Sequence, residues 1–125
     1  LKEQHFGIPS RNYFEKSLSQ ITALRHYYRI WIASDDLILS REILKDLDTK
    51  LPISFLDSTD LSDVEVWDLF RHFKGYIISS SSFSWWAAFL RKDRTAPVFC
   101  PDPWFQGMKD PDSLIPHEWH KVAAL

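Results

Sequence analysis

Apolar residues recur along this chain with two alternating spacings, one typical of helices and one of short buried strands. The helical spacing predicts helices over residues 12–26, 37–48, 63–73 and 83–92. Short apolar runs between them, rich in β-branched and aromatic residues, predict strands at residues 29–33, 52–56, 76–78 and 97–100. The chain from residue 101 is rich in proline and aromatic residues, and we predict a loop there that ends in a short helix near residues 117–124.

Strand and helix alternate from residue 12 to residue 100, which predicts parallel strands joined by right-handed helical crossovers. The predicted fold class is α/β, with a Rossmann-like parallel sheet and flanking helices. The length of 125 residues suits a single domain. Because the chain begins with Leu1 rather than methionine, we expect residues 1–125 to be one partial domain of a longer protein.

Composition and charge exclude several classes of protein. Aromatic residues make up 15% of the chain, which is too much apolar surface for a disordered protein. The net charge of −2 gives no electrostatic basis for binding nucleic acid. A single cysteine, Cys100, excludes an internal disulfide and a cysteine-based zinc site. No apolar run is long enough to span a bilayer, so we expect a bacterial cytoplasmic protein, with peripheral attachment to the inner membrane left open.

The clearest candidate for an anion site is the serine run at residues 79–82, which leads directly into the helix predicted at 83–92. A helix that begins among serines presents backbone N–H groups and hydroxyls at its positive end. None of the three glycines lies in a phosphate-binding glycine motif, so a diphosphate would be held by this run instead. The simpler interpretation is that Ser82 only caps its helix.

Carboxylates near the predicted strand ends have two interpretations as well. Asp35 and Asp36 follow the first strand, where they either cap the next helix or hold a ribose or base. Glu65 and Asp68 lie on the third predicted helix, off its apolar stripe, where a carboxylate is usually just solvated.

The remaining polar and aromatic motifs carry less weight. His117 and His120 are three residues apart rather than four, which does not match the helical zinc motif, and we predict no metal site. Trp85 and Trp86 at a helix start either stack a base or sugar, or belong to the core.

Residues 76–90 read Y-I-I-S-S-S-S-F-S-W-W-A-A-F-L, which closely resembles the I-I-A-N-S-(S/T)-F-S-W-W signature of the family 11 glycosyltransferases, the α-1,2-fucosyltransferases. The flanking sequence agrees. Residues 30–36 resemble the family's strand ending in S-D-D, and residues 6–9 and 12–14 resemble the segment after its arginine motif. Residues 101–105 and 115–119 resemble its A-P-x-x-W-F and I-P-x-x-W elements.

The resemblance implies the C-terminal domain of a GT-B-like, inverting, metal-independent enzyme with no bound cofactor. Such an enzyme transfers L-fucose from GDP-fucose to the 2-hydroxyl of galactose in a glycan acceptor. By this resemblance Ser81, Ser82, Phe83 and Ser84 lie against the donor diphosphate, Asp36 belongs to the donor site, and Glu65 or Asp68 holds guanine. The catalytic residues are not assigned.

Two features depart from the family pattern. Ser80 stands where the family usually has asparagine, and the H-x-R-R-G-D motif is absent from the 125 residues. We expect that motif to precede Leu1 and the fragment to be inactive alone, because the arginines neutralise the leaving group. The alternatives are a glycosyltransferase that uses another nucleotide sugar and a non-catalytic α/β binding module.

Overall fold

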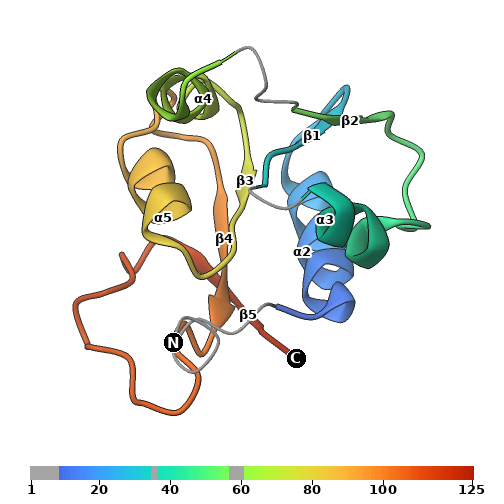
Figure 1. The fold of residues 1–125 in the computed structure, drawn as a ribbon. Coiled ribbons are helices and arrows are strands. Elements are labelled where there is room, and N and C mark those ends of the chain that lie inside the picture. The colour runs from blue at the N-terminus through green and yellow to red at the C-terminus, as the bar shows by residue number, and fades with distance from the viewer. Residues whose placement is uncertain (1–8, 35–36, 57–60) are drawn as a thin grey trace.

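The computed structural model describes residues 9–34, 37–56 and 61–125, and Figure 1 shows its helices and strands. In chain order the elements are α2 (Arg11–Leu24), β1 (Ile30–Ile32), α3 (Leu37–Leu44), β2 (Ile53–Phe55), α4 (Asp63–Phe70), β3 (Tyr76–Ile77), α5 (Ser82–Phe89), β4 (Val98–Asp102) and β5 (His120–Ala123). This order confirms the predicted α/β class. No helix in those ranges is long and apolar enough to cross a membrane.

All strand pairings are parallel, but the strands form two sheets rather than the one expected. β1 pairs with β2, and Ile30 lies opposite Ile53. β3, β4 and β5 form the second sheet in that order, with Tyr76 opposite Val98 and Phe99 opposite His120. The β1–β2 and β3–β4 pairs follow the predicted rule that strands joined through a helix run in the same direction, whereas β4 and β5 are parallel with a loop between them.

The predicted helix near residues 117–124 is wrong, because the chain there forms strand β5. Val122 is buried and its neighbours in the strand are exposed, which is the two-residue period of a strand rather than a helical period. Pairing with the free edge of β4 decides the outcome, and the Ala124 N–H extends that pairing by donating to the Asp102 carbonyl at 3.0 Å.

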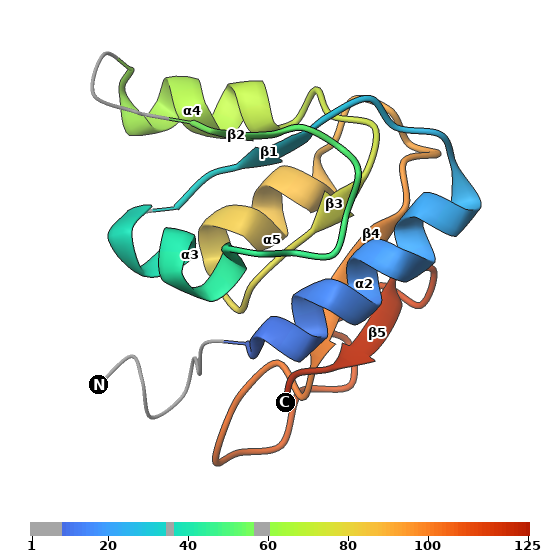
Figure 2. The same cartoon turned by 90° about the vertical axis from the view of Figure 1, so that its right-hand side faces the viewer.

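Helices cover both sides of the strands. Figures 1 and 2 show α2 and α3 on one side of β3 and β4, and α4 and α5 on the other. Ser10 caps α2, since its hydroxyl accepts from the Tyr13 N–H. The first four residues of β4 are buried, so this strand is the centre of the packed core.

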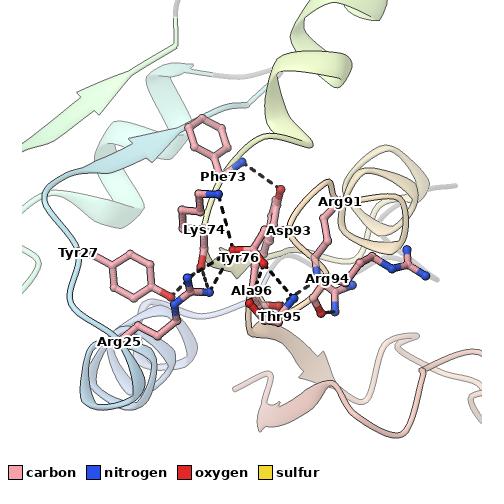
Figure 3. Close-up of polar contacts among 10 residues, drawn as sticks. All are labelled: Arg25, Tyr27, Phe73, Lys74, Tyr76, Arg91, Asp93, Arg94, Thr95 and Ala96. Atoms are coloured by element: carbon pink, nitrogen blue, oxygen red, sulfur yellow. Dashed lines mark hydrogen bonds and ion pairs between the residues drawn. The ribbon is translucent and has the colours of Figure 1, made fainter.

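Polar contacts join the amino ends of β1 and β3, as Figure 3 shows. Arg25, just after α2, donates to the Lys74 carbonyl and pairs with Asp93. The Tyr27 hydroxyl donates to the same carbonyl at 3.0 Å. The Tyr27 ring also lies over Gly75, where a Cβ atom would come within 2.8 Å of its Cζ. The segments that lead into β1 and β3 therefore start side by side.

Candidate functional site

The carboxyl ends of β1 and β3 open onto a cleft of about 900 Å³. In open parallel sheets this end of the strands is where ligands bind. Polar residues line that end of the cleft: Ser34 after β1, Asp63 at the start of α4, and the serine run with the first turn of α5, residues 79–84.

The serine run forms a tight turn held by its own side chains. The Ser84 hydroxyl lies 2.7 Å from the Ser81 hydroxyl and 3.1 Å from the carbonyl oxygens of Ser79 and Ser81. The Ser81 hydroxyl also accepts from the Ser84 N–H at 3.1 Å. Ser81, not Ser82, is therefore the N-cap of α5. The hydroxyls of Ser81 and Ser84 are occupied within the turn.

This turn leaves two backbone donors for a ligand. In the described part of the chain, the N–H groups of Ser82 and Phe83 have no hydrogen-bond partner. Both residues are exposed and stand at the positive end of the helix dipole. With the Ser82 hydroxyl, they make an arrangement suited to an oxyanion or a diphosphate.

The predicted donor-binding residues fall into three groups. Ser81, Ser82, Phe83 and Ser84 are brought together at the mouth of the cleft. Asp68 lies on α4 without lining the cleft, and its carboxylate pairs with the Arg71 guanidinium at 2.7 Å. Asp36 lies outside the described residues.

The carboxylate that does line the cleft is Asp63, which the sequence reasoning missed. Glu65 instead accepts from the Ser62 N–H at 3.1 Å and completes a capping box. Those hydrogen bonds to Ser62 lower the pKa of Glu65. The place of Asp63 at the start of a predicted helix could have identified it, because the first residue of a crossover helix lies at the carboxyl ends of the strands.

Comparison with known proteins bears on this site. The family model described as Glycosyl transferase family 11 matches residues 2–123. This chain belongs to glycosyl transferase family 11. It is also 24% identical over 121 residues to an α-1,2-colitosyltransferase from Escherichia coli, covering 93% of this chain and 40% of that protein. No solved structure matches.

In this family 11 chain, the signature-like residues 76–90 form β3, the serine turn and α5. The two tryptophans of that stretch differ in their surroundings. Trp85 donates from its indole nitrogen to the Leu114 carbonyl at 3.0 Å and stacks on Phe89 with ring centroids 4.9 Å apart. Trp86 is 50% exposed. The core interpretation therefore fits Trp85, whereas Trp86 presents its ring to solvent.

The histidine, cysteine and acidic side chains of the described residues are dispersed rather than clustered. No group of three or more histidine, cysteine, aspartate or glutamate side chains gathers among the residues that the structure describes. His120 stacks on Phe99 with ring centroids 4.5 Å apart, and His117 is exposed. Cys100 is buried, and burial raises the pKa of its thiol to about 12.

A second cavity, of about 380 Å³, lies at the amino end of β4 and includes three arginines. Arg91 donates to the carbonyls of Ala88, Ala96 and Arg94. Arg94 donates to the Phe89 carbonyl, and Arg25 pairs with Asp93. Figure 3 draws the three arginines together with their partners Asp93 and Ala96. These contacts engage the three guanidinium groups in holding the loop between α5 and β4. The serine turn, with its two unpartnered N–H groups, is therefore the better ligand site.

Proposed function

We propose that this chain supplies the diphosphate-binding part of the donor site of an α-1,2-fucosyltransferase-like enzyme. The whole enzyme would transfer L-fucose from GDP-fucose to the 2-hydroxyl of a galactose in a glycan acceptor. The observation that carries the proposal is the pair of unpartnered N–H groups of Ser82 and Phe83 at the start of α5. Two fixed donors at a positive helix end complement a diphosphate.

Asp63 is our candidate for holding the guanine base. A carboxylate accepts from the N1–H and N2–H₂ groups of guanine together. Asp63 lines the same cleft as the serine turn, whereas Glu65 and Asp68 do not line it. Asp36, which belongs to the predicted donor site and lies outside the described residues, stays a prediction.

The chain spans 40% of the length of the curated relative it matches, so the activity of the whole protein is part of the proposal. We propose that the 125 residues form part of one nucleotide-sugar-binding domain of GT-B type. The donor reaction would need no metal or cofactor, and basic residues outside this chain would neutralise the leaving GDP. A bacterial cytoplasmic location, peripheral to the inner membrane, fits a nucleotide-sugar donor.

A titration of the protein with GDP, GDP-fucose and UDP tests the donor site, with NMR of the six tryptophan indole N–H signals as readout. We expect one or two indoles to shift with GDP and GDP-fucose but not with UDP. Ser82→Asp should weaken GDP binding at least about tenfold, since it places a negative charge against the diphosphate.

Ser19→Asp is the matched control, because Ser19 is an exposed serine on α2 and acquires the same charge. Equal GDP affinity in the wild type and Ser82→Asp would contradict the site. A folded protein, carrying its natural flanking sequence, that binds none of the three nucleotides would favour the non-catalytic module.

The second candidate is colitosyl transfer, which the α-1,2-colitosyltransferase relative favours. Colitose is fucose without its 3-hydroxyl group, so both donors would use the same diphosphate site. Competition between GDP-fucose and GDP-colitose for the wild-type protein distinguishes them. A preference of tenfold or more corresponds to about 1.4 kcal/mol and would identify the sugar that the enzyme recognises.

A further inference from the structure

β1 and β3 each have one edge that pairs with no strand among the described residues. On β1, the Ile30 N–H donates to Pro52 and the Ile32 carbonyl accepts from Leu56, so both residues face β2. Backbone groups alternate in direction along a strand. The N–H and C=O of Trp31 therefore point away from β2, toward the cleft.

The same alternation applies to β3. The N–H groups of Tyr76 and Ile78 donate to the carbonyls of Pro97 and Phe99 at 2.9 Å, toward β4. The backbone groups of Ile77 then point away from β4. Residues 30–34 and 76–79, which include both strands, line the cleft along their whole length. Two unpaired strand edges thus face the same cleft.

These two edges run in the same direction. Arg25 and Tyr27, which precede β1, contact Lys74 and Gly75, which precede β3. At the other end, Ser34 and the serine turn border the cleft together. A strand placed between β1 and β3 could therefore pair in parallel with both.

The cleft is apolar on both of its faces. Phe14, Leu18 and Ile21 of α2 and Leu39, Ile43 and Leu44 of α3 line one face, and Val66 and Phe70 of α4 line the other. No described side chain of α3 is buried, and Leu39 is 40% exposed. An amphipathic helix normally buries its apolar stripe, so this part of the core lacks a layer.

We propose that the cleft is the seat of a further β-strand, parallel to β1 and β3, which joins the two sheets into one. The completed strand order would be β2-β1-new strand-β3-β4-β5. The volume agrees, since a five-residue strand in a sheet occupies roughly 800 Å³ at ordinary strand and layer spacings, and the cleft measures about 900 Å³. A strand covered on both faces is apolar at every position.

The occupant is a segment of the same polypeptide outside these 125 residues, and it leads into α2. Pro9 lines the cleft, and the Tyr13 hydroxyl contacts the Ile78 carbonyl at the carboxyl end of β3. The strand would end on that side of the cleft, from which the chain continues to the start of α2. The unit strand–α2–β1 would then have the same hand as β1–α3–β2, because α2 and α3 lie on the same side (Figure 2).

The sequence of the 125 residues offers no further stretch with the composition of such a strand. Outside the helices and strands, no stretch contains four consecutive apolar residues. The relative from Escherichia coli is long enough to supply one, since this chain covers only 40% of it. The strand would fill the apolar part of the cleft between β1 and β3, so a nucleotide would bind at the polar mouth formed by Ser34, Asp63 and the serine turn. The inference itself does not depend on the proposed function, because it concerns backbone pairing in the absence of ligand.

The test uses the intact polypeptide that carries these residues, without nucleotide. We expect the amide protons of Trp31 and Ile77 to exchange with solvent at rates within about tenfold of those of Ile30 and Ile78, whose N–H groups donate to strands on the other edges.

Disulfide formation separates an inserted strand from direct pairing of β1 with β3. Ile30 and Ile77 both pack against the α2 side of the core, so we use Ile30→Cys/Ile77→Cys with Cys100→Ala. We expect no disulfide in this pair, because an intervening strand separates the two by about 10 Å. The control Ile30→Cys/Ile53→Cys joins registered partners and should oxidise.

Each alternative gives a distinct result that overturns the proposal. Fast exchange of Trp31 and Ile77 in the intact protein would mean an empty cleft. Efficient disulfide formation between positions 30 and 77 would mean that β1 and β3 pair directly. Protection that disappears on dilution would mean that a second copy of the chain supplies the strand.

Discussion

The hydroxyl of Tyr13 donates to the backbone carbonyl of Ile78 at 2.5 Å. In the β3–β4 ladder this carbonyl faces the position of Pro101, which has no N–H to donate. Tyr13 therefore supplies the hydrogen bond that the proline cannot, and its oxygen also lies 3.2 Å from the Phe99 carbonyl. The contact fixes the start of α2 to the end of β3, directly before the serine turn.

Tyr13→Phe should lower the free energy of unfolding by about 1–3 kcal/mol, because it leaves a buried carbonyl without its donor. Tyr13 is fully buried, so water cannot replace the hydroxyl without rearrangement. Urea denaturation followed by tryptophan fluorescence measures the change. Tyr28→Phe is the matched control and should change little, since Tyr28 is 82% exposed. Equal effects of the two variants would contradict the role assigned to Tyr13.

The capping assignment gives a second prediction. Ser81→Ala should destabilise the protein by about 1 kcal/mol, because it removes the acceptor for the Ser84 N–H. Ser82→Ala should be close to neutral in stability, since the Ser82 side chain is exposed and is not the cap. Thermal unfolding of both variants distinguishes them. A larger loss for Ser82→Ala would mean that Ser82 caps α5.

The sequence predicted the elements well and their partners less well. Period and turn residues located every helix and strand from residue 11 to residue 102, because those signals are local. β5 was missed because His120–Ala123 is a strand only by virtue of the free edge of β4. The split into two sheets was missed for the same reason, since strand pairing is a long-range property.

The candidate site shows the same division. The serine run and its helix start were visible in sequence, since a cap needs only neighbouring residues. Which hydroxyl caps and which carboxylate lines the cleft depended on the rotation of the helices. Asp63 lines the cleft, whereas Asp68 turns toward Arg71. A shift of a few positions along a helix changes the face on which a side chain lies.

The paired tryptophans should respond differently to substitution. Trp85→Phe should cost about 1–3 kcal/mol, because the Leu114 carbonyl loses its indole donor and the stack on Phe89 is weakened. Trp86→Phe should stay within about 0.5 kcal/mol, since half of the Trp86 side chain is already in solvent. Chemical denaturation of the two variants measures both. A greater cost for Trp86→Phe would show that the edge contacts of its ring with Trp85 and Phe89, at centroid distances of 4.8 and 5.8 Å, contribute more to stability than the buried contacts of Trp85.

The ionised carboxylate of Asp93 stabilises the folded protein, and this stabilisation is lost at acid pH. The hydroxyl and N–H of Thr95, and then the Arg25 guanidinium, lower the pKa of Asp93 from 3.8 to about 2. The folded protein therefore binds fewer protons at this group than the unfolded chain does. Its stabilisation is fully present above the unfolded pKa of 3.8 and is lost as the pH falls from about 4 to about 2.

Asp93→Asn tests this relationship. The wild type should be more stable than the variant at pH 6, and the difference should shrink as the pH falls from about 4 to about 2, as Asp93 becomes protonated. Urea midpoints across pH 2–6 measure the difference. Asp112→Asn, in an exposed loop, removes the same charge and serves as the control. If the difference in stability between wild type and Asp93→Asn stays constant over this range, the variant acts through packing. The ion pairs of Asp93 with Arg25 and Lys74 would then make no contribution to the difference.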